Sequence, residues 1–444
     1  MSGRHPITRR DIDRLAVPAI ISGIAEPIIS LVDTAFVGRL GTADLAAVGI
    51  SASFFLLVVW VLAQTRSAVL AVVARYYGED RLDEIRGLVP LAVWMNFALG
   101  LVFFLVTNAL AGPIFRLYNA QGEVLEKAIA YYHVRSFGHP MVLATFALTG
   151  AFRGMQNLRW NMWLSVTGAL INLVLNPILI FGWGPVPAMG IRGSALASLI
   201  AQVVMFVSAI VILERRTPFR IVPVRWTHPE VPSLLLLSGN LFARTIALNV
   251  CYYLGNRYAT GYGQAYIGAH SIAMNIWLFS AFFIDGYAAA GSVLAGRLNG
   301  SRDWRQLYLV SWQVVRRSIW IGIGLAVLNA LLYVPIGHLF TADLEVHRLF
   351  VGIFWMVIVT QPLNAIAFAF DGIFKGLGEG ALLRNVLILS TALVFVPVIL
   401  IGHQLDGLLF AVWSAFLAWM AARSLALAVS FQRRYRPGSG VRTR

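Results

Sequence analysis

Two acidic residues, Glu26 and Asp33, stand inside a long apolar stretch near the beginning of the chain. An ionisable side chain within a membrane costs free energy, so such residues usually face a partner or a water-filled cavity and often mark an ion path. The two carboxylates are about two helical turns apart and would share one helix face. Pro27 removes a backbone hydrogen bond between them, so we expect a kink there. The pattern predicts a bending helix whose acids take up protons or cations; for Glu26, an ion pair with a basic residue such as Arg66 is the alternative.

Other polar side chains interrupt later apolar segments. Asn172 and Asn176 are spaced by about one helical turn, so they share a face, and Pro177 follows directly. Ser198 lies among small residues in the next apolar segment. Amides and hydroxyls commonly form hydrogen bonds between helices in membranes. These three residues are therefore candidates either for structural bonding or for direct participation with Asp33.

The second half of the chain places Arg244, Asp285 and Asp371 in three different apolar segments. A guanidinium beside two carboxylates favours a closed ion-pair network over an open cation site. We therefore expect structural pairing of these residues, with drug binding or a gating pair as the alternative.

The composition excludes a soluble fold. Of the 444 residues, 59% are hydrophobic and only 12% are charged, and the mean hydropathy is +0.74. Soluble domains carry about 25% charged residues. The apolar runs show no period-two alternation, which argues against a membrane β-barrel. The sequence predicts an all-α polytopic membrane protein.

A membrane-spanning helix needs about 20 mostly apolar residues. The chain has twelve segments that meet this need: 14–39, 44–74, 86–111, 124–152, 158–181, 190–213, 232–256, 264–296, 305–334, 344–374, 381–402 and 406–431.

The basic residues predict the orientation of these segments. The loops and tails on one side of the predicted membrane hold 23 Lys and Arg residues, and the opposite loops hold 6. By the positive-inside rule, both termini are expected in the cytoplasm, with the protein in the inner (plasma) membrane. This placement accounts for the net charge of +15 without nucleic acid as a partner.

Short motifs repeat at one offset along the chain. Arg75 and Arg297 are 222 residues apart, and so are the turns Gly150–Gly154 and Gly372–Gly376. Repeats in this order at one offset indicate a duplication. Because each half holds an even number of spans, the halves are expected to be parallel six-helix bundles related by a pseudo-two-fold axis along the membrane normal.

We therefore predict four parts: an N-terminal bundle over 1–213, a polar and proline-rich cytoplasmic linker over 214–231, a C-terminal bundle over 232–432, and a basic cytoplasmic tail over 433–444. Two such bundles suit transport by alternating access.

The motifs resemble those of the multidrug and toxic compound extrusion (MATE) family. The likeness rests on Val32-Asp33-Thr34-Ala35-Phe36-Val37-Gly38 and on the two repeated glycine turns; Arg244-Thr245, Ile284-Asp285-Gly286 and Phe370-Asp371-Gly372 resemble its DinF branch. The resemblance implies a secondary antiporter that expels cationic, amphipathic compounds in exchange for H⁺ or Na⁺, without a cofactor. Asp33 would bind either the proton or the cationic compound.

One departure from the family pattern bears on the coupling ion. Asn176 stands where similar proteins commonly carry an acid, and Ser198 matches a small hydroxyl position of the family. The segment around Arg244 also lacks the carboxylate of the sodium-coupled branch. The resemblance therefore favours H⁺ over Na⁺.

Two other functional classes compete with export. A lipid-linked saccharide flippase of the same superfamily remains an alternative, since Arg66 could hold an anionic group. The acidic loop Glu79–Glu84 could suggest a metal-pyrophosphate site, but its mixed charges fit a solvated turn better. The chain has no His-Glu-x-x-His and no Gly-x-Ser-x-Gly motif, so we expect no enzyme and no metal site. No obligate protein partner is evident from the sequence.

Overall fold

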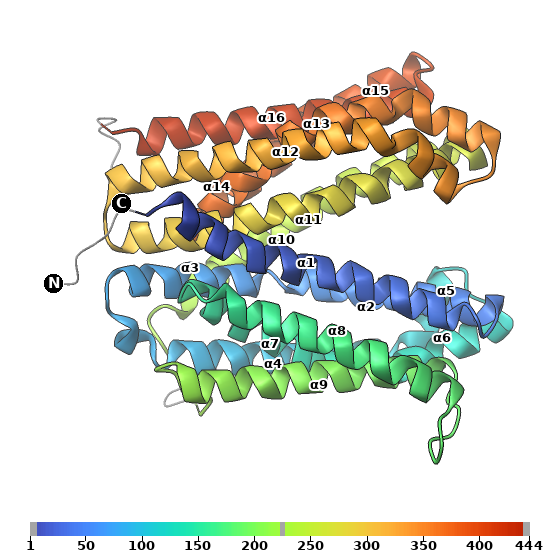
Figure 1. Cartoon of the computed structure of the whole chain (residues 1–444), viewed down its shortest axis with the longest axis horizontal. Helices are drawn as coiled ribbons and strands as arrows, with labels where there is room; N and C mark the ends of the chain where they lie inside the picture. Colours follow the sequence, from blue (N-terminus) through green and yellow to red (C-terminus); the bar gives the residue numbers. More distant parts are fainter. Residues whose placement is uncertain (1–6, 223–226, 438–444) are drawn as a thin grey trace. The chain divides into compact units, whose positions relative to one another are not determined.

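The computed structural model describes residues 7–222 and 227–437, except for the side chains of residues 26–32 (Figure 1). The described residues are almost entirely helical, and their only β-type pairing is an isolated bridge between Trp183 and Val186. The first half contains α1 (Arg9–Val37), α2 (Thr42–Leu62), α3 (Thr65–Gly78), a short 3₁₀ helix (Leu82–Ile85), α4 (Leu88–Ala109), α5 (Ala111–Leu117), α6 (Gly122–Arg135), α7 (Gly138–Gly154), α8 (Leu158–Phe181) and α9 (Ile191–Arg216).

The second half contains α10 (Val231–Tyr262), α11 (Gln264–Gly300), α12 (Trp304–Phe340), α13 (Leu344–Gly376), α14 (Gly380–Ser390), a π-helical segment (Thr391–Phe395), α15 (Val396–Gln404) and α16 (Leu408–Tyr435). Two of these helices begin with an aspartate cap. The Asp303 carboxylate accepts a hydrogen bond from the Gln306 amide, and the Asp343 carboxylate accepts from the amides of Glu345 and Val346. Such caps satisfy donors that have no partner within the helix.

Helices cover all twelve predicted membrane segments. Within the described residues, ten helices or helix runs are long and apolar enough to cross a membrane. The other two predicted spans correspond to α1 and to the pair α6–α7, which is interrupted at Ser136–Phe137. The prediction of an all-α polytopic membrane protein is confirmed.

The chain packs as two compact units, which differ from the predicted parts at their boundaries. The first-half unit runs from Ile21 to Leu236; the second-half unit comprises the chain up to Ile20 and from Leu237 onward. The beginning of α1 therefore packs with the second-half unit, and the described part of the linker packs with the first-half unit. In the predicted tail, α16 continues to Tyr435, while residues 438–444 and linker residues 223–226 lie outside the described chain.

The repeated glycine turns have the same packing role in each unit. In the second-half unit, a Cβ at Gly372 or Gly376 of α13 would overlap the α11 backbone at Ala288 or Ser292. In the first-half unit, a Cβ at Gly150 of α7 would overlap the α3 backbone at Arg66. Small residues permit this close approach between helices in membranes. The duplicated motif thus fixes corresponding helix pairs, and α11, α12, α13 and α16 run side by side in Figure 1.

We predict that Gly372→Ala destabilises the protein by about 1–3 kcal/mol, the usual cost of overpacking a well-filled interior. Gly352→Ala is the matched control, because Gly352 lies on the same helix, is exposed, and would gain a Cβ with no neighbouring atom within 4 Å. Thermal unfolding of both variants in detergent measures the difference. Equal melting temperatures for the two variants would contradict this account of the close helix pair.

Candidate functional site

A chain of hydrogen bonds in the first-half unit joins four of the predicted site residues. Asn176 Nδ2 donates to Asp33 Oδ1 and also to Asn172 Oδ1, the latter at 2.7 Å. Asn172 Nδ2 donates to Ser198 Oγ at 2.9 Å. The structure therefore brings together residues of α1, α8 and α9 that lie far apart in the sequence, as expected from their polarity and spacing.

Local packing positions the two amides. Asn172 and Asn176 lie one turn apart on α8 and are buried, with 2% and 0% of their surface exposed. Helix α9 approaches α8 closely because Gly193 has no side chain; a Cβ there would overlap the backbone at Leu179. This approach brings Ser198 within hydrogen-bonding distance of Asn172. The amide chain is thus a consequence of tight packing between α8 and α9.

Asp33 differs from a structurally paired acid. Its side chain is partly exposed, and within the described chain it accepts a hydrogen bond from Asn176 and forms no ion pair with a basic side chain. The basic side chain of Arg135 on α6 lies within electrostatic reach of Asp33. The Arg135 guanidinium instead stacks on the Phe55 ring, at 3.8 Å from its centroid. The carboxylate therefore stays available to a proton or a cation.

The side chains of Glu26 and Pro27 lie outside the described residues, so the kink and the ion pair with Arg66 stay predictions. Arg66 itself lies over the Phe146 ring, at 5.2 Å from the centroid.

The second-half unit contains the expected ion pair. Arg244 of α10 donates to Asp371 Oδ1 of α13, from Nη2 at 2.6 Å and from Nε at 2.9 Å. Lys375, one turn further along α13, donates to Asp371 Oδ2 at 2.7 Å. Asp285 is different, because its side chain is exposed on α11, although it lies within electrostatic reach of Lys375. Arg244 and Asp371 thus form the predicted closed pair, and Lys375 joins it as a further member.

Sequence reasoning missed three basic residues: Arg135, Lys375 and Arg423. Arg423 on α16 is 1% exposed and lies within electrostatic reach of Asp371. A signal was available for two of them, because Arg135 and Arg423 are among the few basic residues inside predicted spans. The pattern could not show which partners they face.

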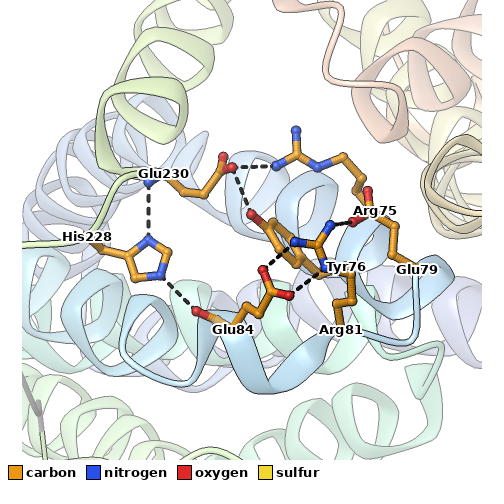
Figure 2. A network of polar contacts seen from close by, with 7 residues as sticks. All are labelled: Arg75, Tyr76, Glu79, Arg81, Glu84, His228 and Glu230. Carbon is orange, nitrogen blue, oxygen red and sulfur yellow. Dashed lines mark hydrogen bonds and ion pairs between the residues drawn. The ribbon is translucent and has the colours of Figure 1, made fainter.

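The predicted linker is tied to the first-half unit by a polar network (Figure 2). Glu230 accepts hydrogen bonds from Arg75 at 2.7 Å and from the Tyr76 hydroxyl at 3.0 Å. His228 accepts from the Glu230 amide through Nδ1, and its Nε2 lies 3.1 Å from the Glu84 carbonyl oxygen. These contacts fix the segment before α10 against the turn that follows α3.

The acidic loop Glu79–Glu84 belongs to the same network. Arg81 forms ion pairs with Glu84 and with Glu79, and its hydrogen bond with Glu84 raises the pKa of Arg81. The Arg81 and Glu84 side chains are exposed. Among the described residues there is no group of three His, Cys, Asp or Glu side chains that could hold a metal ion. The geometry fits the solvated turn and gives no support to a metal-pyrophosphate site.

A family comparison identifies the class of protein. The family model described as MatE matches residues 18–178 and again residues 241–401. The chain belongs to the MatE family. The double match confirms the duplication, and members of this family are transporters rather than enzymes. It gives no support to the lipid-linked saccharide flippase.

Individual relatives agree with this assignment. Protein DETOXIFICATION 44, chloroplastic, of Arabidopsis thaliana is 30% identical, over 83% of this chain and 72% of that protein. DNA damage-inducible protein F of Escherichia coli is 26% identical, over 96% of this chain and 92% of that protein, which agrees with the predicted DinF branch. A probable multidrug resistance protein NorM of Photorhabdus laumondii is 26% identical, over 91% and 87%.

A solved structure shares the fold. The crystal structure of MATE in the bent conformation superposes with a TM-score of 0.88 and 22% identity, covering 97% of this chain and 96% of that one. By its family match and its long apolar helices, the protein is a multi-pass MATE-family membrane transporter.

The charge balance at Asp371 predicts unequal effects of mutation. Asp371→Asn removes the one carboxylate that Arg244 and Lys375 share, so it should destabilise the protein by about 3 kcal/mol or more, as for a broken buried pair. Arg244→Gln leaves Asp371 with Lys375 and should cost less. Chemical unfolding of both variants in detergent measures the difference. A larger loss for Arg244→Gln than for Asp371→Asn would contradict the assignment of Asp371 as the shared anion.

Proposed function

We propose that this transporter is a secondary antiporter that exports cationic, amphipathic compounds in exchange for protons. Asp33 is the group that the proton and the cationic compound occupy in turn. One observation supports this proposal most directly. The Asp33 carboxylate accepts a hydrogen bond from the neutral amide of Asn176 and forms no ion pair among the described residues. A carboxylate in this state can lose its charge without breaking a salt bridge.

The exchange follows from the charge of Asp33. When Asp33 is ionised, it attracts a cation, and the hydrogen bond from Asn176 Nδ2 stabilises the charged carboxylate. Protonation neutralises the carboxylate, so the attraction disappears and the cation leaves. Binding of the cation and binding of the proton are therefore mutually exclusive. The membrane potential contributes about 2.3 kcal/mol per charge moved for each 100 mV.

The names of relatives support the class of substrate. The Photorhabdus relative NorM is named a probable multidrug resistance protein, and this chain aligns with it over most of both lengths. Apolar cations suit a site in which one carboxylate supplies the negative charge. The partners we propose are accordingly small cationic compounds, the coupling ion and membrane lipid, with no cofactor, no obligate protein partner and no nucleic acid.

Na⁺ is the second candidate for the coupling ion. The Asn176 Oδ1 atom is buried and has no hydrogen-bond partner among the described residues, so it could serve as a Na⁺ ligand beside Asp33. Among the described side chains, the site otherwise supplies neutral amides and a hydroxyl around the single carboxylate of Asp33. We favour H⁺ because one carboxylate is sufficient for a proton. We also propose the inner (plasma) membrane as the location, with both termini in the cytoplasm.

We predict that Asp33→Asn abolishes dye transport driven by a pH gradient in proteoliposomes, because the amide can neither ionise nor release a proton. The matched control is Asp83→Asn, since Asp83 is exposed and its ion pair with Arg86 lies at the surface, where such pairs contribute little. The control protein should transport dye at the rate of the unchanged protein.

The same assay separates the coupling ions when pH and sodium gradients are imposed one at a time. The proposal expects transport with the pH gradient and none with sodium alone. Sustained transport by folded Asp33→Asn protein would overturn the role of Asp33. Transport driven by sodium alone would replace H⁺ with Na⁺ as the coupling ion.

A further inference from the structure

Arg423 is a buried cation whose hydrogen-bonding capacity is largely unused. It lies in the middle of α16 with 1% of its surface exposed. Its guanidinium carbon lies 4.6 Å from the centroid of the Trp419 ring, and Nη1 lies 3.3 Å from the sulfur of Met420. The Nε and Nη2 atoms are buried and have no hydrogen-bond partner among the described residues. A thioether is a weak acceptor, so the guanidinium has no strong partner within the described chain.

The two unused donors lie on the same edge of the guanidinium. Nε and Nη2 point their N–H bonds in parallel, which matches the spacing of the two oxygens of a carboxylate. A buried donor without an acceptor costs free energy, and a buried charge without a counter-charge costs more. The fold therefore buries the Arg423 guanidinium with two unsatisfied donors, and a carboxylate ligand would satisfy both.

The nearby protein carboxylate already has other partners. Asp371 Oδ1 binds Arg244, and Asp371 Oδ2 binds Lys375. Arg423 lies within electrostatic reach of both Asp371 and Arg244. Three basic side chains, those of Arg244, Lys375 and Arg423, thus stand against two carboxylates, that of Asp371 and that of Asp285, which lies within electrostatic reach of Lys375. This region of the second-half unit carries an excess of positive charge.

The other neighbours of Arg423 are mostly apolar or aromatic. Cys251 and Tyr252 of α10 lie within electrostatic reach of its charge. Cys251 Sγ lies 3.3 Å from Thr391 Oγ1, and Thr391 begins the π-helical segment. Phe395, at the end of that segment, packs against Trp419 with ring centroids 6.0 Å apart. Short π-helical turns inside α-helices are frequent at functional sites. Aromatic neighbours suit the carbon skeleton of an organic ligand.

We propose that Arg423 binds the carboxylate of a small organic anion within the second-half unit, through Nε and Nη2. The ligand has an apolar or aromatic body that packs among the side chains of α16, α10 and the π-helical segment. This site is separate from Asp33, and the proposal does not depend on proton coupling.

Thermal unfolding of the purified full-length protein in chloride-free detergent buffer tests the site. Benzoate is the probe, and benzamide is the uncharged compound of similar shape. Benzoate should raise the melting temperature with increasing concentration, whereas benzamide should not. Arg423→Lys keeps the charge but loses the paired donors, so its apparent affinity for benzoate should fall roughly 30-fold or more.

Arg423→Met removes both charge and donors. Because it replaces a buried charge with an apolar group, it should fold with a melting temperature at or above that of the unchanged protein and should not respond to benzoate. Arg433→Gln is the matched control, since Arg433 is exposed on the same helix. It should keep the full response to benzoate.

Three results would overturn the proposal. The first is that benzoate leaves the melting temperature of the unchanged protein unaltered. The second is that benzoate raises the melting temperature of Arg423→Met as much as that of the unchanged protein. The third is that chloride or benzamide raises the melting temperature as much as benzoate does. Each result is independent of dye transport, so failure of this site and failure of Asp33 as the coupling group are distinguishable.

Discussion

Lipid offers no water to a charged side chain, and this constraint governs where the polar residues of the chain lie. A charge inside a helix bundle must be paired, hydrogen-bonded or placed where solvent or a ligand reaches it. Asp371 meets this requirement through Arg244 and Lys375, which occupy both of its oxygens. Asp33 meets it differently, with partial exposure and the amide of Asn176. The first arrangement fixes a charge permanently, whereas the second leaves a charge that can be neutralised.

The duplication preserved helix packing but not polar chemistry. Gly150 and Gly372, at corresponding places in the two halves, both allow a close approach to a neighbouring helix backbone. The polar residues have diverged: among the described side chains, the first half joins Asp33 to neutral amides, and the second half gathers basic side chains around Asp371. Two halves with similar helix packing can thus carry different charged groups. The cation-binding role that we propose lies in the first half, and the excess of positive charge lies in the second.

Much of this arrangement could be predicted from the sequence. The length of an apolar segment determines whether it can cross a membrane as a helix. The predicted segments therefore matched the helices. The spacing of Asn172 and Asn176 placed both amides on one face, and the structure joins them to Asp33 and Ser198. These predictions succeeded because they rest on helix periodicity and on the cost of burying polar groups.

Other features depend on contacts between distant segments and could not be predicted. A lone arginine in an apolar segment indicates burial, but Arg135 and Arg423 showed their surroundings only in the folded chain. Lys375 was not expected in the network of Arg244 and Asp371, and it joins because it lies one turn from Asp371 on α13. The boundary of the units at Ile20, within α1, is likewise set by packing rather than by composition.

The central claim is that a proton and a cationic compound compete for Asp33. The most direct measurement is proton release when a cationic dye binds to the purified protein in weakly buffered detergent solution. The account predicts that dye binding acidifies the solution, and that Asp33→Asn protein binds dye weakly and releases no protons. Tight dye binding to the unchanged protein without any release of protons, across the pH range in which the protein transports, would contradict it.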